Sequence, residues 1–251
     1  MHVLGIDIGG SAVKGAIVDT QQGCFTKERI KIELTNGASV SAINQAVAEI
    51  VTQFQWDGLI GCGFPAVVKN GVVHTAANID ENFIGLNVEE LFSTTTGRRV
   101  KVYNDADAAG FAELKFGHIK DFKGFVIFLT VGTGIGSALF YNGQLISNTE
   151  LGHVFMKNGI KGEKFTSDAI REKLDLTWDK WGVRFNKYLE YLQSLFYPDL
   201  FIIGGGTSKK FEKFSHKLTV ATHVVPAKLL NDAGIIGAAT LAFMENQTFT
   251  D

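Results

Sequence analysis

The sequence predicts an α/β protein with a mixed β-sheet, and three features of the 251-residue chain lead to this prediction. Strands are expected over the short apolar segments 3–8, 13–19, 24–34, 59–64 and 100–103. Residues 39–54 carry apolar side chains three and four positions apart, as an amphipathic helix does. Strands, a helix and then more strands are typical of an α/β layer with a mixed sheet.

A second run of strands begins at Gly124 and repeats the pattern of the first. The segment GFVIFLTVGTGIGSALF has the form of VLGIDIGGSAVKGAIV, because in both an apolar strand ends in a glycine-rich turn and another strand follows. This weak internal duplication predicts two related halves. We expect a helix over 177–196, a buried strand over 200–203, a C-terminal helix over 234–244 and a surface loop over 158–170.

The two halves are expected to form close-packed lobes with a cleft between them, since no linker rich in proline or serine separates them. The small N-terminal lobe takes residues 1–118 and is closed by the C-terminal helix within 234–251. The larger C-terminal lobe takes residues 119–233.

Composition narrows the function classes. The 45% of hydrophobic residues supports a buried core, and the formal charge of -2 gives no global basic field for nucleic acid. No stretch approaches the roughly 18 apolar residues of a membrane-spanning helix, so a cytoplasmic protein is expected. Cys24 and Cys62 are too few for a disulfide framework or a four-ligand zinc site, and both are expected to be buried.

Two glycine-rich turns are the first candidate sites. GIDIGGSAVKGA (5–16) and LTVGTGIGSALF (129–140) allow backbone N–H groups to approach an oxyanion without a Cβ in the way. Neither is a Walker loop or a dinucleotide fingerprint, because a strand follows each turn. Either one alone fits a tight hairpin. Two of them at matching places favour phosphate binding.

Asp7 and Lys14 flank the first of these turns. A carboxylate at the end of a buried strand can hold Mg²⁺, directly or through water, beside phosphate oxygens. Asp7 alternatively hydrogen-bonds its own hairpin. Lys14, on the returning strand, either neutralises phosphate or lies in solvent.

Asn104 and Asp105, in VYNDADAAGFAE (102–113), are expected at the end of a strand where a helix begins. Asp105 fits a general base that takes a proton from a sugar hydroxyl. In isolation the segment favours an N-cap role for Asp105 or Asp107.

Glu150 and His153 lie close together in NTELGHVF (148–155). A carboxylate and an imidazole can bind vicinal sugar hydroxyls, which need both donors and acceptors. Such a pair also occurs on ordinary polar surfaces.

The segment DLFIIGGGTSKKFEKF (199–214) predicts a buried strand, a glycine turn and a helix that Thr207 or Ser208 caps. A helix N-terminus after glycines suits an anion or a nucleotide. On this helix Phe211, Phe214 and Leu218 form one stripe, and beside it lies a second stripe of Lys210, Lys213 and Lys217. These lysines either line the rim of a binding groove or form a basic edge of the helix that faces solvent.

In this order, the segments resemble the motifs of the ROK family of sugar kinases. The resemblance implies the sugar-kinase/actin-like (ribonuclease H-like) fold, with two lobes and a central cleft. It implies that Asp105 is the catalytic base and that Asn104, Glu150 and His153 bind the sugar. Segments 61–73 and 75–92 resemble the segments that line the sugar side of the cleft in this family. The resemblance implies that Gly63 and Pro65, in the first of these segments, contact the sugar.

The glycine segments resemble the two phosphate motifs and the adenosine-side motif of that family. The implied contacts to the phosphoryl donor are Asp7, Gly9, Gly10, Ser11, Lys14, Gly132, Thr133, Gly134, Gly204, Gly205, Gly206, Lys209, Lys210 and Lys213.

Two features resemble the polyphosphate glucokinase branch of the family. Typical ATP-dependent ROK glucokinases and ROK repressors carry a cysteine-rich zinc motif after the glutamate-histidine segment, whereas residues 155–168 contain no cysteine. The compact length and PAKLLNDAGIIGAA (226–239) also fit the branch. Two departures are visible: Phe83 stands where the branch often has tryptophan, and we identify no counterpart of the family's zinc-linked glutamate ligand.

The resemblance implies Mg²⁺-dependent phosphorylation of glucose at its 6-hydroxyl, with inorganic polyphosphate, ATP or both as donor. It also implies a homodimer, Mg²⁺ at Asp7 and no zinc. One alternative is an ATP-dependent ROK kinase for mannose, fructose or N-acetylmannosamine. Another is a non-catalytic sugar-sensing regulator, which the start of the first phosphate motif at Gly5 disfavours because no DNA-binding domain precedes it.

Overall fold

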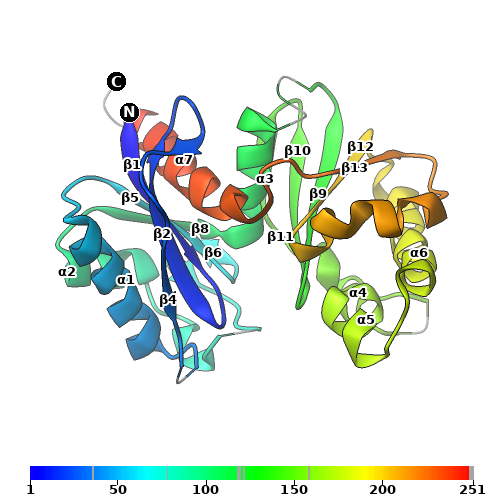
Figure 1. Cartoon of the computed structure of the whole chain (residues 1–251), viewed down its shortest axis with the longest axis horizontal. Helices are drawn as coiled ribbons and strands as arrows, with labels where there is room; N and C mark the ends of the chain where they lie inside the picture. The colour runs from blue at the N-terminus through cyan, green and yellow to red at the C-terminus, as the bar shows by residue number, and fades with distance from the viewer. Residues whose placement is uncertain (36, 78, 118–119, 121, 158, 249–251) are drawn as a thin grey trace. The chain divides into compact units, whose positions relative to one another are not determined.

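The computed structural model describes residues 1–35, 37–77, 79–117, 120, 122–157 and 159–248 (Figure 1). Its contacts divide the chain into two compact units, Met1–Phe116 with Asp232–Asp251, and Gly117–Asn231. We call them the first and the second unit. The lobe boundary expected between residues 118 and 119 lies outside the described residues.

The first unit contains a mixed sheet with the strand order β3-β2-β1-β5-β8, in which β4 also pairs with β2. Strand β1 is antiparallel to β2 and parallel to β5, which is parallel to β8. The strands are β1 (His2–Ile8), β2 (Ala12–Asp19), β3 (Cys24–Phe25), β4 (Ile30–Glu33), β5 (Ile60–Phe64) and β8 (Val100–Asn104). This arrangement is the predicted mixed sheet.

The strand expected over 24–34 is two short strands, β3 and β4. Both pair with β2, but Phe25 and Ile30 are five residues apart while their partners Val18 and Gly15 are three apart. The extra residues leave the sheet, so the strand is interrupted. Cys24 on β3 is exposed, contrary to expectation, whereas Cys62 on β5 is buried.

Helices α1 (Val40–Phe54) and α2 (Val88–Thr96) belong to the core on one face of this sheet. Helix α1 confirms the helix predicted over 39–54, and Ser39 caps it, since the Ser39 side chain accepts a hydrogen bond from the Ala42 N–H at 3.2 Å. A hairpin of β6 (Val68–Lys69) and β7 (Val72–Val73) and the short 3₁₀ helix η1 (Glu81–Phe83) complete this side. Phe83 is fully buried and packs edge-on against Phe64.

Helices α3 (Asp105–Phe116) and α7 (Ala233–Thr248) pack together, and α7 covers the opposite face of the sheet (Figure 1). Successive side chains of a strand point to opposite faces, so Leu4 and Ile6 face the core with α1 while Gly5 faces α7. At Gly61 an added Cβ would lie 2.1 Å from the Ala238 carbonyl oxygen, so β5 and α7 meet backbone to backbone.

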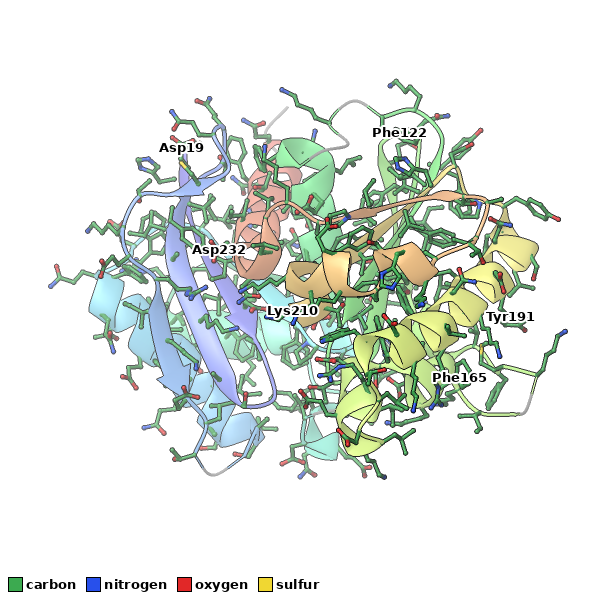
Figure 2. The ribbon with its side chains drawn as sticks, turned by 45° about the vertical axis from the view of Figure 1, so that its right-hand side comes forward. Asp19, Phe122, Phe165, Tyr191, Lys210 and Asp232 are labelled. Carbon is green, nitrogen blue, oxygen red and sulfur yellow. The ribbon has the colours of Figure 1, made fainter. Side chains whose placement is uncertain are left out.

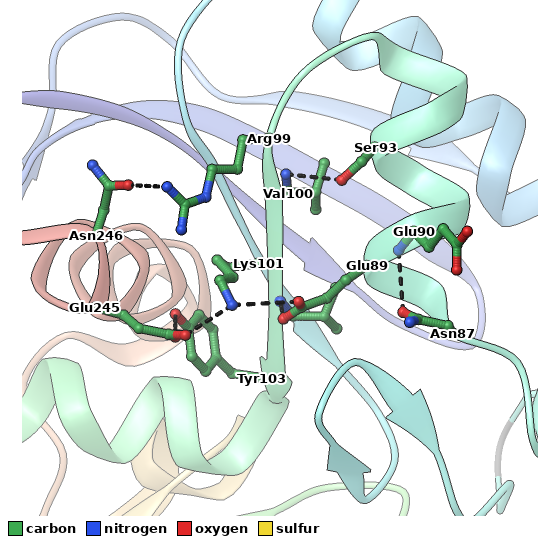
Figure 3. A network of polar contacts seen from close by, with 11 residues as sticks. Asn87, Glu89, Glu90, Ser93, Arg99, Val100, Lys101, Tyr103, Glu245 and Asn246 are labelled. Atoms are coloured by element: carbon green, nitrogen blue, oxygen red, sulfur yellow. Dashed lines mark hydrogen bonds and ion pairs between the residues drawn. The ribbon is translucent and has the colours of Figure 1, made fainter. Parts of the chain in front are cut away.

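Strand β8 is held between α2 and α7 by polar side chains (Figure 3). The Lys101 ammonium lies 2.8 Å from Glu245 and 3.4 Å from Glu89, and the Tyr103 hydroxyl donates to Glu245 at 2.7 Å. Burial acts to raise the pKa of Glu245, but the hydrogen bonds from Lys101 and Tyr103 outweigh it and hold the pKa below its usual value. Glu245 therefore stays ionised and ties α7 to β8.

The second unit has a sheet of the order β11-β10-β9-β12-β13. Strand β9 is antiparallel to β10 and parallel to β12, as β1 is antiparallel to β2 and parallel to β5. The repeated sequence pattern thus corresponds to a repeated strand arrangement. The strands are β9 (Phe125–Val131), β10 (Ile135–Tyr141), β11 (Gln144–Thr149), β12 (Leu200–Gly204) and β13 (His223–Pro226).

Helix α6 (Trp178–Phe196) supplies the aromatic core of the second unit. Thr177 caps it, since the threonine hydroxyl accepts from the Lys180 N–H at 3.3 Å. Trp181 stacks on Phe185 with ring centroids 4.8 Å apart, and both side chains are fully buried. The helix predicted over 177–196 is confirmed.

The surface loop predicted over 158–170 is wrong. Helices α4 (Gly162–Thr166) and α5 (Asp168–Lys173) lie there, although Asn158 is outside the described residues. The Trp181 indole N–H donates to the Thr166 carbonyl at 3.0 Å, and Thr166 is fully buried. Tertiary anchoring, which no apolar period in the sequence reveals, makes this segment helical.

Within the part of the chain that the structure describes, no helix is long and apolar enough to cross a membrane.

Gly237→Ala should destabilise the protein, although replacing a helical glycine by alanine normally stabilises by about 0.5–1 kcal/mol. The new Cβ would lie 1.7 Å from the Ala108 carbonyl oxygen, so α3 and α7 would have to separate. We expect urea denaturation to show a loss of about 2–3 kcal/mol in the free energy of unfolding. Thr240→Ala, on the same helix, removes atoms instead and should cost about 1 kcal/mol. A Gly237→Ala variant as stable as the wild type would contradict this contact.

Candidate functional site

The first glycine turn joins β1 to β2. The Gly9 N–H donates to the Ala12 carbonyl at 2.9 Å, which closes a tight turn. Gly10 and Ser11 at its tip are exposed. The turn is thus a hairpin whose backbone is accessible to a ligand.

Asp7 and Lys14 face each other directly below this turn. They are cross-strand partners in β1 and β2, and the Lys14 ammonium lies 3.5 Å from the Asp7 carboxylate. Burial raises the pKa of Asp7, while the charges of Lys14 and Arg29 oppose that rise. Lys14 therefore pairs with Asp7 and does not extend into solvent.

Asn104 ends β8 and caps α3. Its side-chain oxygen accepts from the Ala106 and Asp107 N–H groups at 2.9 and 3.0 Å, and its amide donates to the Ala66 carbonyl at 3.1 Å. The expected cap by Asp105 or Asp107 is wrong, because Asn104 already receives the N–H groups of the first turn. The half-buried Asp105 accepts the Ala106 N–H at 2.7 Å.

The carboxyl ends of three parallel strands bring several candidates to one edge of the first sheet. Asp7 pairs with Gly63 on β5, and the neighbouring Phe64 pairs with Asn104. An added Cβ at Gly63 would lie 3.6 Å from the Cα of Asp105. Pro65, which follows β5 directly, is half-buried. Sequence positions almost 100 residues apart thus meet at the edge where ligands bind in α/β sheets.

The second glycine turn, within the second unit, joins β9 to β10. The Gly132 N–H donates to the Gly134 carbonyl at 3.0 Å, and the Ala169 N–H of α5 donates to the Gly132 carbonyl at 3.2 Å. No atom lies within 4 Å of a Cβ added at Gly132, and Thr133 is exposed. This turn therefore leaves room beside its backbone.

Glu150 directly precedes the short 3₁₀ helix η2 (Leu151–His153) and His153 ends it, with the His153 Nδ1 4.0 Å from the Glu150 carboxylate. Each side chain is about one third exposed. Gly152 lies against β10, since an added Cβ would be 2.1 Å from the Ile135 carbonyl oxygen. The pair is thereby fixed beside the start of β10, directly after the second glycine turn.

Glu163 on α4 joins this group, and sequence reasoning missed it. Its carboxylate oxygen lies 2.9 Å from a Cβ position built on Gly134. Burial raises the pKa of Glu150 and the negative charge of Glu163 adds to the rise, whereas His153 opposes it. Glu163 stands between lysines in a segment without helical periodicity, so the sequence offered no signal for its position.

The third glycine segment follows β12. Gly205 has φ +73°, and an added Cβ would lie 2.6 Å from the Val131 carbonyl oxygen, so only glycine fits. The predicted α-helix capped by Thr207 or Ser208 is wrong. Gly205 precedes two 3₁₀ helices, η3 (Gly206–Lys213) and η4 (Ser215–Lys217), and the Ser208 hydroxyl donates to the Gly205 carbonyl at 2.7 Å.

The lysines after this turn do not form one continuous stripe. Lys209, Lys210 and Lys213 are exposed on η3, where Figure 2 labels Lys210. Lys217 lies on η4, half-buried, with its ammonium 3.5 Å from Asp179. The break between the two short helices separates Lys217 from the others, contrary to the expected helical spacing.

Comparison with known proteins gives a consistent result. The sequence matches the model of the ROK family over residues 3–169. The chain is 44% identical over 239 residues to the polyphosphate glucokinase of Mycobacterium tuberculosis, covering 95% of this chain and 90% of that protein.

Solved structures match over nearly the whole chain. The inorganic polyphosphate/ATP-glucomannokinase of Arthrobacter sp. strain KM has a TM-score of 0.93 at 39% identity, covering 97% of this chain and 99% of that one. A ROK glucokinase of Streptomyces griseus in complex with glucose and AMPPNP has a TM-score of 0.82 at 23% identity, covering 97% and 100%. These matches confirm the predicted sugar-kinase/actin-like fold.

Charge substitutions near Glu150 should shift its pKa in opposite directions. Glu163→Gln removes a negative charge and should lower the pKa of Glu150, while His153→Gln removes the opposing positive charge and should raise it. A ¹³C NMR titration of the Glu150 carboxyl carbon in each variant measures both shifts. An unchanged Glu150 pKa in Glu163→Gln would contradict the proximity of the two carboxylates.

Proposed function

Because the chain belongs to the ROK family, we propose that it is a kinase that transfers a phosphoryl group from inorganic polyphosphate, ATP or both to the 6-hydroxyl of glucose. The observation that carries the proposal is the meeting of Asp105, Asn104 and Asp7 at one sheet edge beside a glycine turn. The relatives named polyphosphate glucokinase and glucomannokinase support both donor and acceptor. The two units are taken as the two lobes of the kinase.

Asp105 is the proposed general base. Its half-buried carboxylate, held by the Ala106 N–H, accepts the proton of the glucose 6-hydroxyl as that oxygen attacks the terminal phosphoryl group. Phosphoryl transfer needs little covalent help from the protein, so positioning and neutralisation of charge supply most of the catalysis.

Glu150, His153, Asn104 and Glu163 are the proposed sugar ligands, with Gly63 and Pro65 lining the site. Carboxylates accept hydrogen bonds from hydroxyls, and a histidine N–H donates them. Asn104 donates one amide hydrogen to Ala66 and has a second for the sugar. The position of Glu163 beside Glu150 supports its inclusion.

The glycine turns, together with Lys14, Lys209, Lys210 and Lys213, are the proposed donor contacts. Asp7 fits a Mg²⁺ ligand, because Mg²⁺ usually takes one or two carboxylates and completes its shell with water and phosphate oxygens. When bound, Mg²⁺ would neutralise phosphate charge. Among the described residues no group of three or more His, Cys, Asp or Glu is placed to hold a metal. The absence of zinc, the homodimer, the cytoplasmic location and the lack of a nucleic-acid partner stay predictions.

Mannose is a second candidate acceptor, since the 39% identical Arthrobacter enzyme is a glucomannokinase. Purified protein assayed with glucose or mannose, and with ATP or long-chain polyphosphate, tests the proposal. Product formed from glucose with polyphosphate supports it. No transfer to glucose from either donor would overturn it.

Asp105→Asn should keep glucose binding within a few-fold and lower kcat by about two to four orders of magnitude, the usual effect of losing a general base. Glucose affinity from calorimetry and kcat from a coupled assay separate the two effects. Asp57→Asn, at an exposed position, is the control and should leave both unchanged. If Asp105→Asn keeps more than about a tenth of wild-type turnover, Asp105 is not the base.

Replacing Lys209, Lys210 and Lys213 by alanine in one variant should raise KM for long-chain polyphosphate about tenfold. The dependence of this KM on salt should also flatten, because fewer cation contacts release fewer counterions when the polymer binds. KM for ATP should change less, since a nucleotide ends its phosphates after three groups and carries far fewer charges than the polymer. Lys217→Ala, whose lysine already pairs with Asp179, should have the smaller effect. Equal weakening of both donors would show that the lysines only shape the general field.

A further inference from the structure

A row of charged side chains crosses the first sheet beside the first glycine turn. Asp7 on β1 is the cross-strand partner of Lys14 on β2, and Lys14 is in turn the partner of Lys31 on β4. Directly opposed residues point to the same face, with Cβ atoms about 5 Å apart. The two lysines are therefore immediate neighbours on that face.

The row continues along β4. Side chains alternate in a strand, so Glu33, two positions after Lys31 on β4, lies on its face. Arg29 directly precedes β4, and its positive charge acts on Asp7 of the row. Ile30 and Ile32 point the other way and pack against the core that contains α1. Lys31 and Glu33 are exposed, and Arg29 is one third exposed. The charged side chains therefore lie on the same face of the sheet as α7. Helix α7 covers this face at β1, and the face continues past the helix to β2 and β4.

Among the described residues, each cation of this row forms an ion pair with a carboxylate. Lys14 pairs with Asp7 at 3.5 Å, Lys31 pairs with Glu33, and the Arg29 guanidinium pairs at 2.9 Å with Asp232, which precedes α7. Figure 2 labels Asp232 at this place. The Lys31 and Arg29 pairs are exposed, and exposed ion pairs contribute only about 0–1 kcal/mol each. The part-buried Lys14–Asp7 pair has a long contact of 3.5 Å, so an incoming polyanion can replace all three.

Two lysines directly opposite each other are unfavourable in a sheet, because like charges at that separation repel. An anion placed between them would remove the repulsion. The row also leads away from the turn. Ile30, which follows Arg29, pairs with Gly15. Gly15 is four residues beyond Ser11 of the turn, about 13 Å along the strand. A chain of phosphates follows such a path, whereas a nucleotide ends its phosphates after three groups.

We propose that Lys14, Lys31 and Arg29 bind the part of a polyphosphate chain that lies beyond the reacting phosphate. This site rests on the proposed function, and it adds Lys31 on β4 and Arg29 directly before β4, both outside the glycine motifs, to the donor contacts. The pairs that hold these cations in place open when the polymer binds.

Substitution of each member of one pair separates this role from a merely structural one. Lys31→Ala should weaken binding of a fluorescent long-chain polyphosphate several-fold, measured by anisotropy, and reduce the salt slope by about 0.7–0.9, the value for one contact. Glu33→Gln removes the competing carboxylate and should tighten binding. If only the ion pair matters, both variants act in the same direction, and that result would overturn the proposal. Lys187→Ala, an exposed lysine on α6, is the control.

Kinetics distinguish the polymer from other phosphate donors. In Lys31→Ala, KM for long-chain polyphosphate should rise several-fold more than KM for tripolyphosphate or ATP. Equal increases for all three donors, or no increase for the polymer, would contradict the site. If the wild type does not use polyphosphate at all, the proposed donor is wrong, and the anisotropy measurement still decides whether the row binds the polymer. Thermal unfolding of each variant confirms that it is folded.

Discussion

The contact of α7 with the sheet and with α3 is the constraint on which the first unit depends. Gly61 and Gly237 let three backbones approach to distances that exclude a Cβ. Strand β5 and helix α3 are thereby both packed tightly against α7. Glu245, near the C-terminal end of α7, binds Lys101 and Tyr103 of β8. Asp7 and Asp105 keep their relative positions because the elements that carry them have no freedom to slide past α7. Larger side chains would separate the layers and the two carboxylates with them.

Much of the fold could be predicted from the sequence, because its elements are marked by local patterns. The helix at 39–54 has both an apolar period and a serine cap, and the two hairpins repeat one strand-glycine-strand pattern. Helices α4 and α5 were missed because each is short and has no apolar face of its own. What holds α4 is the distant Trp181, and no local pattern reports such a contact.

The candidate site divides in the same way. Glycine turns and the Asn104–Asp105 pair are visible in the sequence because their chemistry is local. The cap on α3 was assigned to an aspartate, although Asn104 has the same short polar side chain and stands one position earlier. Glu163 could be identified as a site residue only from the structure, which places it close to Gly134 and Glu150. Lys14 and Lys31 became neighbours only once the register of β2 and β4 was known.

Strand β8 lies at the edge of its sheet, yet its backbone is not open. The Ser93 hydroxyl accepts from the Val100 N–H at 3.1 Å, and the Glu89 carboxylate accepts from the Val102 N–H at 3.0 Å, so α2 occupies the positions that another strand would need (Figure 3). A second chain cannot extend the sheet along this stretch without first displacing a helix. The lateral edge of β8 is therefore protected against the strand-to-strand pairing that leads to amyloid, and folding intermediates are vulnerable there only while α2 is undocked.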